Sequence, residues 1–101
     1  MKFPKPIKIV SKKIRNSAKG ENCTIRYPGC SNDTSTTVLA HLNSRYKGIG
    51  NKSPDILAVY CCDFCHKKLD ASRVPASEQL KALQETLIKL YEKGLIKVDG
   101  A

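Results

Sequence analysis

Four of the five cysteines occur in two short-range pairs, and this spacing constrains the fold more than any other feature of the chain. Cys62 and Cys65 are separated by two residues, the spacing of half a zinc knuckle, whereas six residues separate Cys23 from Cys30. Each pair closes a small loop, and one ion bound by all four thiolates would close the long loop between the pairs. We therefore predict one structural zinc ion, held by Cys23, Cys30, Cys62 and Cys65.

Two alternatives to this ligand set stay open. Cys61 could replace Cys62, or His66 could replace one thiolate. The two-residue spacing favours Cys62, because Cys61 would then point to the other side of an extended strand and pack as a small apolar residue. The odd number of cysteines and the adjacent histidine favour metal binding over disulfides, and hence a reducing, cytoplasmic compartment.

The charge of the chain is unevenly distributed. The net charge is +9, and residues 1–75 carry 14 of the 18 Lys and Arg side chains but 5 of the 9 acidic ones. Seven basic residues and no acidic residue precede Glu21. This excess coincides with the cysteines and predicts a polyanionic partner, nucleic acid first, although a solvated basic arm without a partner is the alternative. No apolar stretch approaches the roughly 18 residues of a membrane-spanning helix, so no membrane partner is expected.

A chain of 101 residues is expected to form one domain, and its patterns predict the α+β class. We predict a basic arm over residues 1–12 and a zinc-containing domain over residues 13–101. Residues 38–42 and 56–60 are short apolar runs and are expected to be buried strands joined by a polar loop. Residues 23–27 favour a further strand, followed by a Pro-Gly turn, and a short helix is expected over residues 65–70.

The C-terminal region predicts an amphipathic helix that covers the core. Ser77 is the expected N-cap, and Gly94 is placed to end the helix with Leu95 packing back in a Schellman motif. The apolar stripe lasts only about two heptads, so a dimerising seam is the less favoured interpretation. That stripe consists of Leu80, Leu83, Leu87 and Leu90.

Three side chains with metal-binding or proton-transfer chemistry remain once the zinc ion has its four ligands. His66 and Asp70 are four residues apart and would share one face of the expected helix. An imidazole and a carboxylate suit an open site for Mg²⁺, Mn²⁺ or Zn²⁺, and a surface hydrogen bond between them is the alternative. His41, taken alone, would more often be a satisfied core histidine. The order of the elements, a strand with a histidine, a loop, a strand and a helix with a second histidine, favours an active site.

That order resembles the HNH, or ββα-metal, endonucleases. Within that superfamily, residues 38–42, residues 48–55 and the Cys62-x₂-Cys65-His66-x₃-Asp70 motif are similar to a small prophage-encoded nuclease family. The resemblance covers about residues 13–97. It implies a small zinc-stapled ββα-metal domain, similar to a treble clef, with an added C-terminal helix.

The resemblance also implies roles for individual residues in a DNA endonuclease that uses Mg²⁺ or Mn²⁺. His41 matches the general base that activates water, and His66 matches the metal-binding histidine of the helix. Asp70 lies where some members have a second metal ligand. Asp55 lies where members often have Asn, so it would orient His41 or bind the metal. Many members carry a metal ligand just before the base, where this chain has Ala40.

Several basic residues flank these positions and are predicted to contact the DNA backbone, although solubility alone would explain any single one. A zinc-containing module that binds nucleic acid without cutting it is the second functional hypothesis. A zinc-stabilised adaptor that binds a protein through the C-terminal helix is the third. The predicted backbone contacts are Arg45, Lys47, Lys52, Lys67, Lys68 and Arg73.

Overall fold

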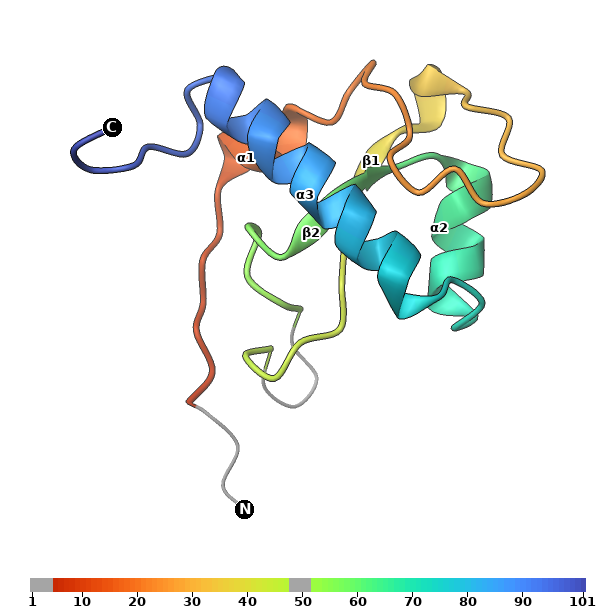
Figure 1. The fold of residues 1–101 in the computed structure, drawn as a ribbon, viewed down its shortest axis with the longest axis horizontal. Coiled ribbons are helices and arrows are strands. Elements are labelled where there is room, and N and C mark those ends of the chain that lie inside the picture. The colour runs from red at the N-terminus through yellow and green to blue at the C-terminus, as the bar shows by residue number, and fades with distance from the viewer. Residues whose placement is uncertain (1–4, 48–51) are drawn as a thin grey trace.

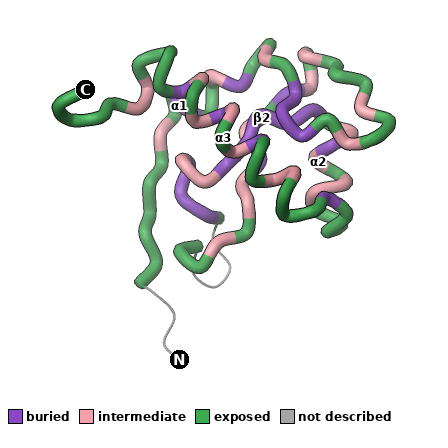
Figure 2. The backbone as a smooth tube through the Cα atoms, in the orientation of Figure 1, coloured by how far each residue is buried: buried purple, intermediate pink, exposed green. Residues whose placement is uncertain are grey.

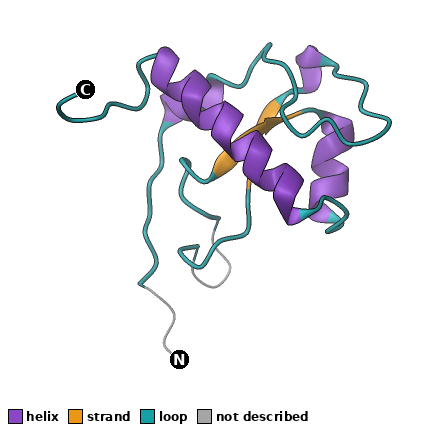
Figure 3. Ribbon diagram, viewed as in Figure 1, coloured by secondary structure: helices purple, strands orange, loops and turns teal. Residues whose placement is uncertain are grey.

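The computed structural model describes residues 5–47 and 52–101. Within these residues, one antiparallel two-stranded sheet pairs Val38 with Cys61 and His41 with Ala58. The chain thus belongs to the α+β class, and the longest helix crosses the sheet (Figures 1 and 3). The elements in chain order are α1 (Lys12–Asn16), the 3₁₀-helix η1 (Thr34–Thr36), β1 (Val38–His41), β2 (Ala58–Cys61), α2 (Asp63–Asp70) and α3 (Ala76–Glu92).

Strand β2 forms the centre of the core, and all four of its residues are buried (Figure 2). Because side chains alternate along a strand, Val59 and Cys61 pack with the cysteines and Ala82 of α3. Tyr60 points the other way and packs with Ile14 and Leu90. The strand therefore joins two apolar clusters, one around the cysteines and one around Tyr60.

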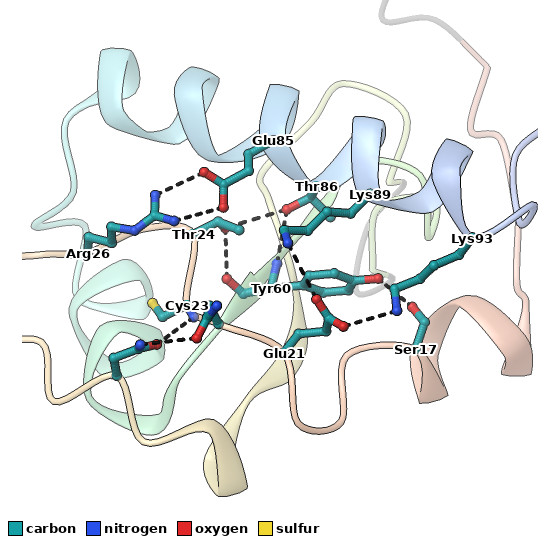
Figure 4. A network of polar contacts seen from close by, with 12 residues as sticks. Ser17, Glu21, Cys23, Thr24, Arg26, Tyr60, Glu85, Thr86, Lys89 and Lys93 are labelled. Atoms are coloured by element: carbon teal, nitrogen blue, oxygen red, sulfur yellow. Dashed lines mark hydrogen bonds and ion pairs between the residues drawn. The ribbon is translucent and has the colours of Figure 1, made fainter.

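Polar contacts attach α3 and Thr24, the residue after the first cysteine, to β2, and a further contact joins Glu21 to the end of α3 (Figure 4). The N–H of Tyr60 donates to Thr86 Oγ1 at 3.2 Å, and the Tyr60 carbonyl accepts from both the N–H and the hydroxyl of Thr24 at 2.8 Å. Glu21 pairs with Lys93 at 3.0 Å, a contact that lowers the pKa of Glu21. These bonds satisfy the edge of β2 that no neighbouring strand covers in the described residues.

The strand predicted over residues 23–27 is wrong. This segment is a loop, because Arg26 takes a left-handed conformation with φ of 52° that interrupts an extended chain. The predicted turn after it is confirmed, with Cys30 N–H donating to the Tyr27 carbonyl at 2.7 Å. Gly29 is required there, since its φ is 93° and a Cβ would lie 3.1 Å from the ring of Phe64.

The predicted hairpin and short helix are present with shifted ends. The second strand starts at Ala58 rather than at residue 56, because Leu57 N–H closes a turn onto the Pro54 carbonyl at 2.9 Å. Helix α2 starts two residues earlier than predicted, with Cys62 at its N-cap. Residues 48–51, which belong to one of the stretches behind the family resemblance, lie outside the described residues.

Helix α3 is confirmed, and so is its ending. Leu95 N–H donates to the Leu90 carbonyl and Gly94 N–H to the Tyr91 carbonyl, both at 2.9 Å, as in a Schellman motif. The predicted N-cap is wrong, because the cap position is Pro75 and Ser77 lies in the first turn. Gln79 instead donates its side-chain amide to the Val74 carbonyl.

The buried face of α3 also differs from the predicted leucine stripe. Its fully buried residues are Ala82, Thr86 and Leu90, whereas Leu80 is 55% exposed. Small residues meet the sheet here because the helix lies close to β2, where Thr86 reaches the strand backbone. No helix in the described residues is both long and apolar enough to cross a bilayer.

Residues 5–11 of the predicted basic arm run along the loop between the strands. In Figure 1 this segment extends away from α1, and two backbone hydrogen bonds hold it. Ile7 N–H donates to the Tyr46 carbonyl at 3.0 Å, and Asp55 N–H donates to the Ile9 carbonyl at 2.9 Å. Ser11 then caps α1 by accepting from the Ile14 N–H. The boundary between arm and domain stays a prediction.

Candidate metal centre and active site

The four predicted cysteines form one cluster. Their sulfur atoms all lie within 4.8 Å of one another, and the Cys30 and Cys62 sulfurs are 3.7 Å apart. A tetrahedral zinc ion with Zn–S bonds of about 2.3 Å needs sulfurs about 3.8 Å apart, so the cluster fits zinc. Within the described ranges this is the only such group of three or more potential ligands, and all five cysteines are free thiols.

Local structure positions these thiols. Cys62 is the N-cap of α2 and Cys65 lies in its first turn, where the partial positive charge of the helix N-terminus favours thiolates. On the other side, Asn32 accepts from Cys23 N–H at 2.9 Å and donates its own N–H to the Cys30 sulfur at 3.3 Å. The N-terminus of α2 and the turn before Cys30 thus bring the four thiols together.

The thiol pKa values indicate why the cluster suits a cation. A hydrogen bond from the Cys61 thiol lowers the pKa of Cys23 to about 3, whereas burial raises the pKa of Cys30. Burial likewise raises the pKa of Cys65, so adjacent thiolates are unfavourable together unless a cation balances their charge. Cys61 itself is buried outside the ligand group, as the spacing predicted.

The second site centres on His41, at the end of β1. Its Nε2 atom is 2.7 Å from Asp55 Oδ1, and the Asp55 side chain is fully buried whereas that of His41 is 11% exposed. Arg15 Nε lies 3.1 Å from Oδ1 and 3.0 Å from Oδ2 of Asp55. The Ser11 N–H donates to Oδ2 at 2.7 Å. Both carboxylate oxygens of Asp55 therefore already have partners.

These contacts keep Asp55 ionised. Burial alone would raise the pKa of Asp55, but hydrogen bonds from Arg15, His41 and Ser11 N–H outweigh it and lower the pKa. A carboxylate that accepts from the imidazole Nε2–H fixes the ring in one orientation and one tautomer. In that tautomer Nδ1 is the nitrogen able to accept a proton.

His41, His66 and Asp70 line one open hollow of about 400 Å³. The His66 Nε2 atom lies 3.7 Å from Asp70 Oδ2, and the two side chains are 38% and 72% exposed. The structure thus brings together, from β1 and α2, the three side chains that the zinc cluster leaves over. An exposed imidazole and carboxylate at this spacing can bind a divalent cation that keeps part of its water shell.

The predicted basic contacts separate into two groups. Lys47 and Lys52 line the hollow with His41, and Arg45 lies in the turn just before Lys47. The other three lie outside it, on α2 or just beyond it. Lys67 pairs with Asp63 at 3.9 Å, Lys68 Nζ lies 5.3 Å from the centre of the Phe64 ring, and Arg73 lines a different hollow with Tyr27.

Sequence reasoning missed three residues around His41. Asn43 lines the same hollow and accepts from Lys47 Nζ at 2.8 Å. Its position two residues after His41, on the same side of an extended chain, was a usable signal. Ser11 and Arg15 carried no such signal, because they reach Asp55 from 44 and 40 residues away in the sequence.

The chain is similar to several known proteins. Residues 12–92 match the family model described as "Putative nuclease YbcO". Proteins named putative nuclease YbcO, from Escherichia coli K12 and from Enterobacteria phage 82, are each 39% identical over 59 residues. That segment covers 56% of this chain and 62% of each relative, so it spans less than two thirds of their length.

One solved structure has a similar fold. It is described as a putative bacteriophage protein from Escherichia coli K-12 and is 29% identical to this chain, with a TM-score of 0.63. The match covers 81% of this chain and 100% of the other one.

Proposed function

Because the chain belongs to the YbcO family, we propose that it is a divalent-metal-dependent endonuclease of the HNH type that hydrolyses DNA phosphodiester bonds and carries a structural zinc ion. One observation carries the proposal. His41, held by the buried carboxylate of Asp55, opens onto the same hollow as the His66–Asp70 pair. The order of β1, β2 and α2 agrees with that of ββα-metal nucleases.

His41 acts as the general base in this proposal. Asp55 holds Nε2, so Nδ1 takes the proton from the attacking water. A base and its orienting carboxylate need a rigid mutual geometry, which the contacts of Asp55 with Arg15 and Ser11 support. Because both oxygens of Asp55 are engaged, we assign this residue to orientation and not to metal binding.

His66 and Asp70 hold the catalytic ion, Mg²⁺ or Mn²⁺. When bound, the ion supplies positive charge for a phosphate oxygen and for the leaving oxygen. Magnesium usually keeps several waters and takes only one or two carboxylates from a protein, so a two-residue site is sufficient. Lys47 and Lys52, on the rim of the same hollow, hold the DNA backbone.

The second candidate is a zinc-containing module that binds nucleic acid without cutting it. The observation in its favour is that His66 and Asp70 are only two potential metal ligands. Within the described residues, no third carboxylate, histidine or cysteine lies close enough to bind the same ion. A basic chain with a rigid zinc cluster would still bind the DNA backbone.

Nicking of supercoiled plasmid in Mg²⁺ or Mn²⁺ separates the two candidates. His41 and His66 are the only two histidines of the chain, so they form a matched pair of variants. His41→Ala should lower the nicking rate by about 10²–10⁴-fold and leave zinc content and DNA affinity unchanged, because it removes only the base. His66→Ala should lower it as strongly, but excess Mn²⁺ should restore part of that activity.

Equal nicking by wild-type and His41→Ala protein would contradict the endonuclease and favour the binding module. A chelator control needs a zinc measurement alongside it, because removal of the structural ion would unfold the domain and mimic loss of the catalytic ion.

A further inference from the structure

A second hollow, of about 250 Å³, lies between the N-terminal segment and the loop before β2. Four basic side chains line it: Lys8, Arg15, Lys47 and Lys52. No acidic residue lines it among those that the structure describes. Arg15 is already paired with the buried Asp55, so the three lysines supply most of the positive charge, which favours a ligand that carries negative charge.

Apart from Ser53, the rest of the wall is apolar. Ile7 and Ile9 line the hollow and are 49% and 37% exposed, and Pro54 also lines it. The backbone bonds from Ile7 to Tyr46 and from Asp55 to Ile9 hold this wall in place. A preformed pocket lined by both cations and aliphatic side chains suits a ligand that has both an anion and a ring.

This hollow adjoins the proposed active site. The two hollows share Lys47, Lys52 and Ser53. The buried carboxylate of Asp55 connects the two hollows. It accepts a hydrogen bond from His41, which lines the hollow of the proposed active site, and from Arg15, which lines the second hollow. A ligand in the second hollow is therefore next to whatever reacts at His41.

We propose that this hollow is a subsite for one unpaired nucleotide beside the phosphate to be cut. Its phosphate contacts Lys8 and Arg15, and its base lies against Ile9 and Pro54. In a duplex both faces of a base are stacked on its neighbours, so only a base outside the stack can contact an apolar wall. This proposal rests on the proposed endonuclease function. It implies that the substrate is DNA with an unpaired nucleotide at the cleavage position.

The test compares two DNA duplexes of the same sequence, one fully paired and one with a single unpaired nucleotide. Dissociation constants are measured by fluorescence anisotropy on the zinc-loaded protein without added Mg²⁺, so no cleavage occurs. Wild-type protein should bind the second duplex about fivefold more tightly, near the least that a base stacked on an aromatic ring contributes, because the wall here is aliphatic.

Matched variants locate the effect. Ile9→Ala should remove most of the preference and leave affinity for paired DNA unchanged. Ile88→Ala makes the same change at a more exposed position on α3, 61% against 37%, and should alter neither. Lys8→Ala should weaken binding to both duplexes and reduce the slope of log K against log salt by about 1. Lys19→Ala removes the same charge outside the hollow and should have a smaller effect. If Ile9→Ala lowers the melting temperature, the more exposed Ile7→Ala replaces it.

Equal affinity of wild-type protein for the two duplexes would overturn the subsite, and so would a preference that both Ile9→Ala and Ile7→Ala retain. Neither result affects nicking that depends on His41. If the protein does not nick DNA but prefers the duplex with the unpaired nucleotide, and this preference requires Ile9, the subsite is supported and the endonuclease proposal is contradicted.

Discussion

Cys65 and His66 are neighbours in the sequence, yet they belong to sites of opposite character. Cys65 is fully buried in the cysteine cluster, whereas the side chain of His66 is 38% exposed on the open hollow. A closed set of four thiolates gives a metal no position for substrate, and an open pair leaves several. One turn of α2 thus supplies a candidate structural metal site on one side and a candidate catalytic site on the other.

The two sites also differ in what holds them. The cysteine cluster is built from a helix start and a tight turn, with Asn32 bonded to both Cys23 and Cys30. The orientation of His41 depends on Asp55, and Asp55 depends on Ser11 and Arg15, which are at least 40 residues away near the N-terminus. We expect the cluster to control folding and the His41 site to control activity.

The largest expected effect comes from the cluster. Cys65→Ala should unfold the protein and lower its zinc content from about one ion per chain to nearly zero, because structural zinc in small domains supplies about 10–16 kcal/mol of apparent binding free energy. Circular dichroism and elemental analysis would measure both.

Cys61→Ala is the matched control, because Cys61 is as buried as Cys65 but lies outside the predicted ligand group. This variant should keep its zinc and lose about 1–2 kcal/mol of stability. Zinc lost from Cys61→Ala and kept by Cys65→Ala would reverse the assignment.

Asp55→Asn should act on the second site with a smaller effect. An Asn oxygen can still accept from His41, so nicking should fall by about tenfold, less than for His41→Ala. The free energy of unfolding should fall by about 1–3 kcal/mol, because Arg15 and the Ser11 N–H lose a charged acceptor, while zinc content stays the same. Activity as low as in His66→Ala would show instead that Asp55 binds the metal. Equal stability of Asp55→Asn and wild type would contradict the supporting role of these contacts.

The smallest effect should be visible in acid. The pKa of Asp55 is lower in the folded protein than in the unfolded chain. The ionised Asp55 therefore stabilises the fold fully at pH values above the unfolded-state pKa, and this stabilisation is lost as the pH falls through the folded-state pKa. Below about pH 4, wild-type protein should therefore lose stability more steeply than Asp55→Asn. Protonation of the cysteine thiolates affects both proteins alike, so the difference between their melting temperatures isolates Asp55. Parallel acid curves would contradict an ionised Asp55.

Local spacing was enough to predict much of this molecule. The short-range spacing within each cysteine pair, the turn before Cys30, the hairpin followed by a helix and the Schellman ending at Gly94 all depend on residues within a few positions of one another. Such patterns can be identified without knowing which distant segment packs against them. The α2 spacing that puts His66 and Asp70 on one face belongs to the same class.

Only the tertiary structure decided the rest. Residues 23–27 have strand-forming side chains, but the chain must turn at Arg26 to bring Cys23 and Cys30 to the start of α2. Close packing on β2 placed Ala82 and Thr86 beside Leu90 on the buried face of α3, whereas Leu80 is exposed. Arg15 was one of seven similar basic residues until folding placed it against Asp55. The physical reason is common to all three: the deciding partner lies dozens of residues away, where periodicity and local propensity carry no information.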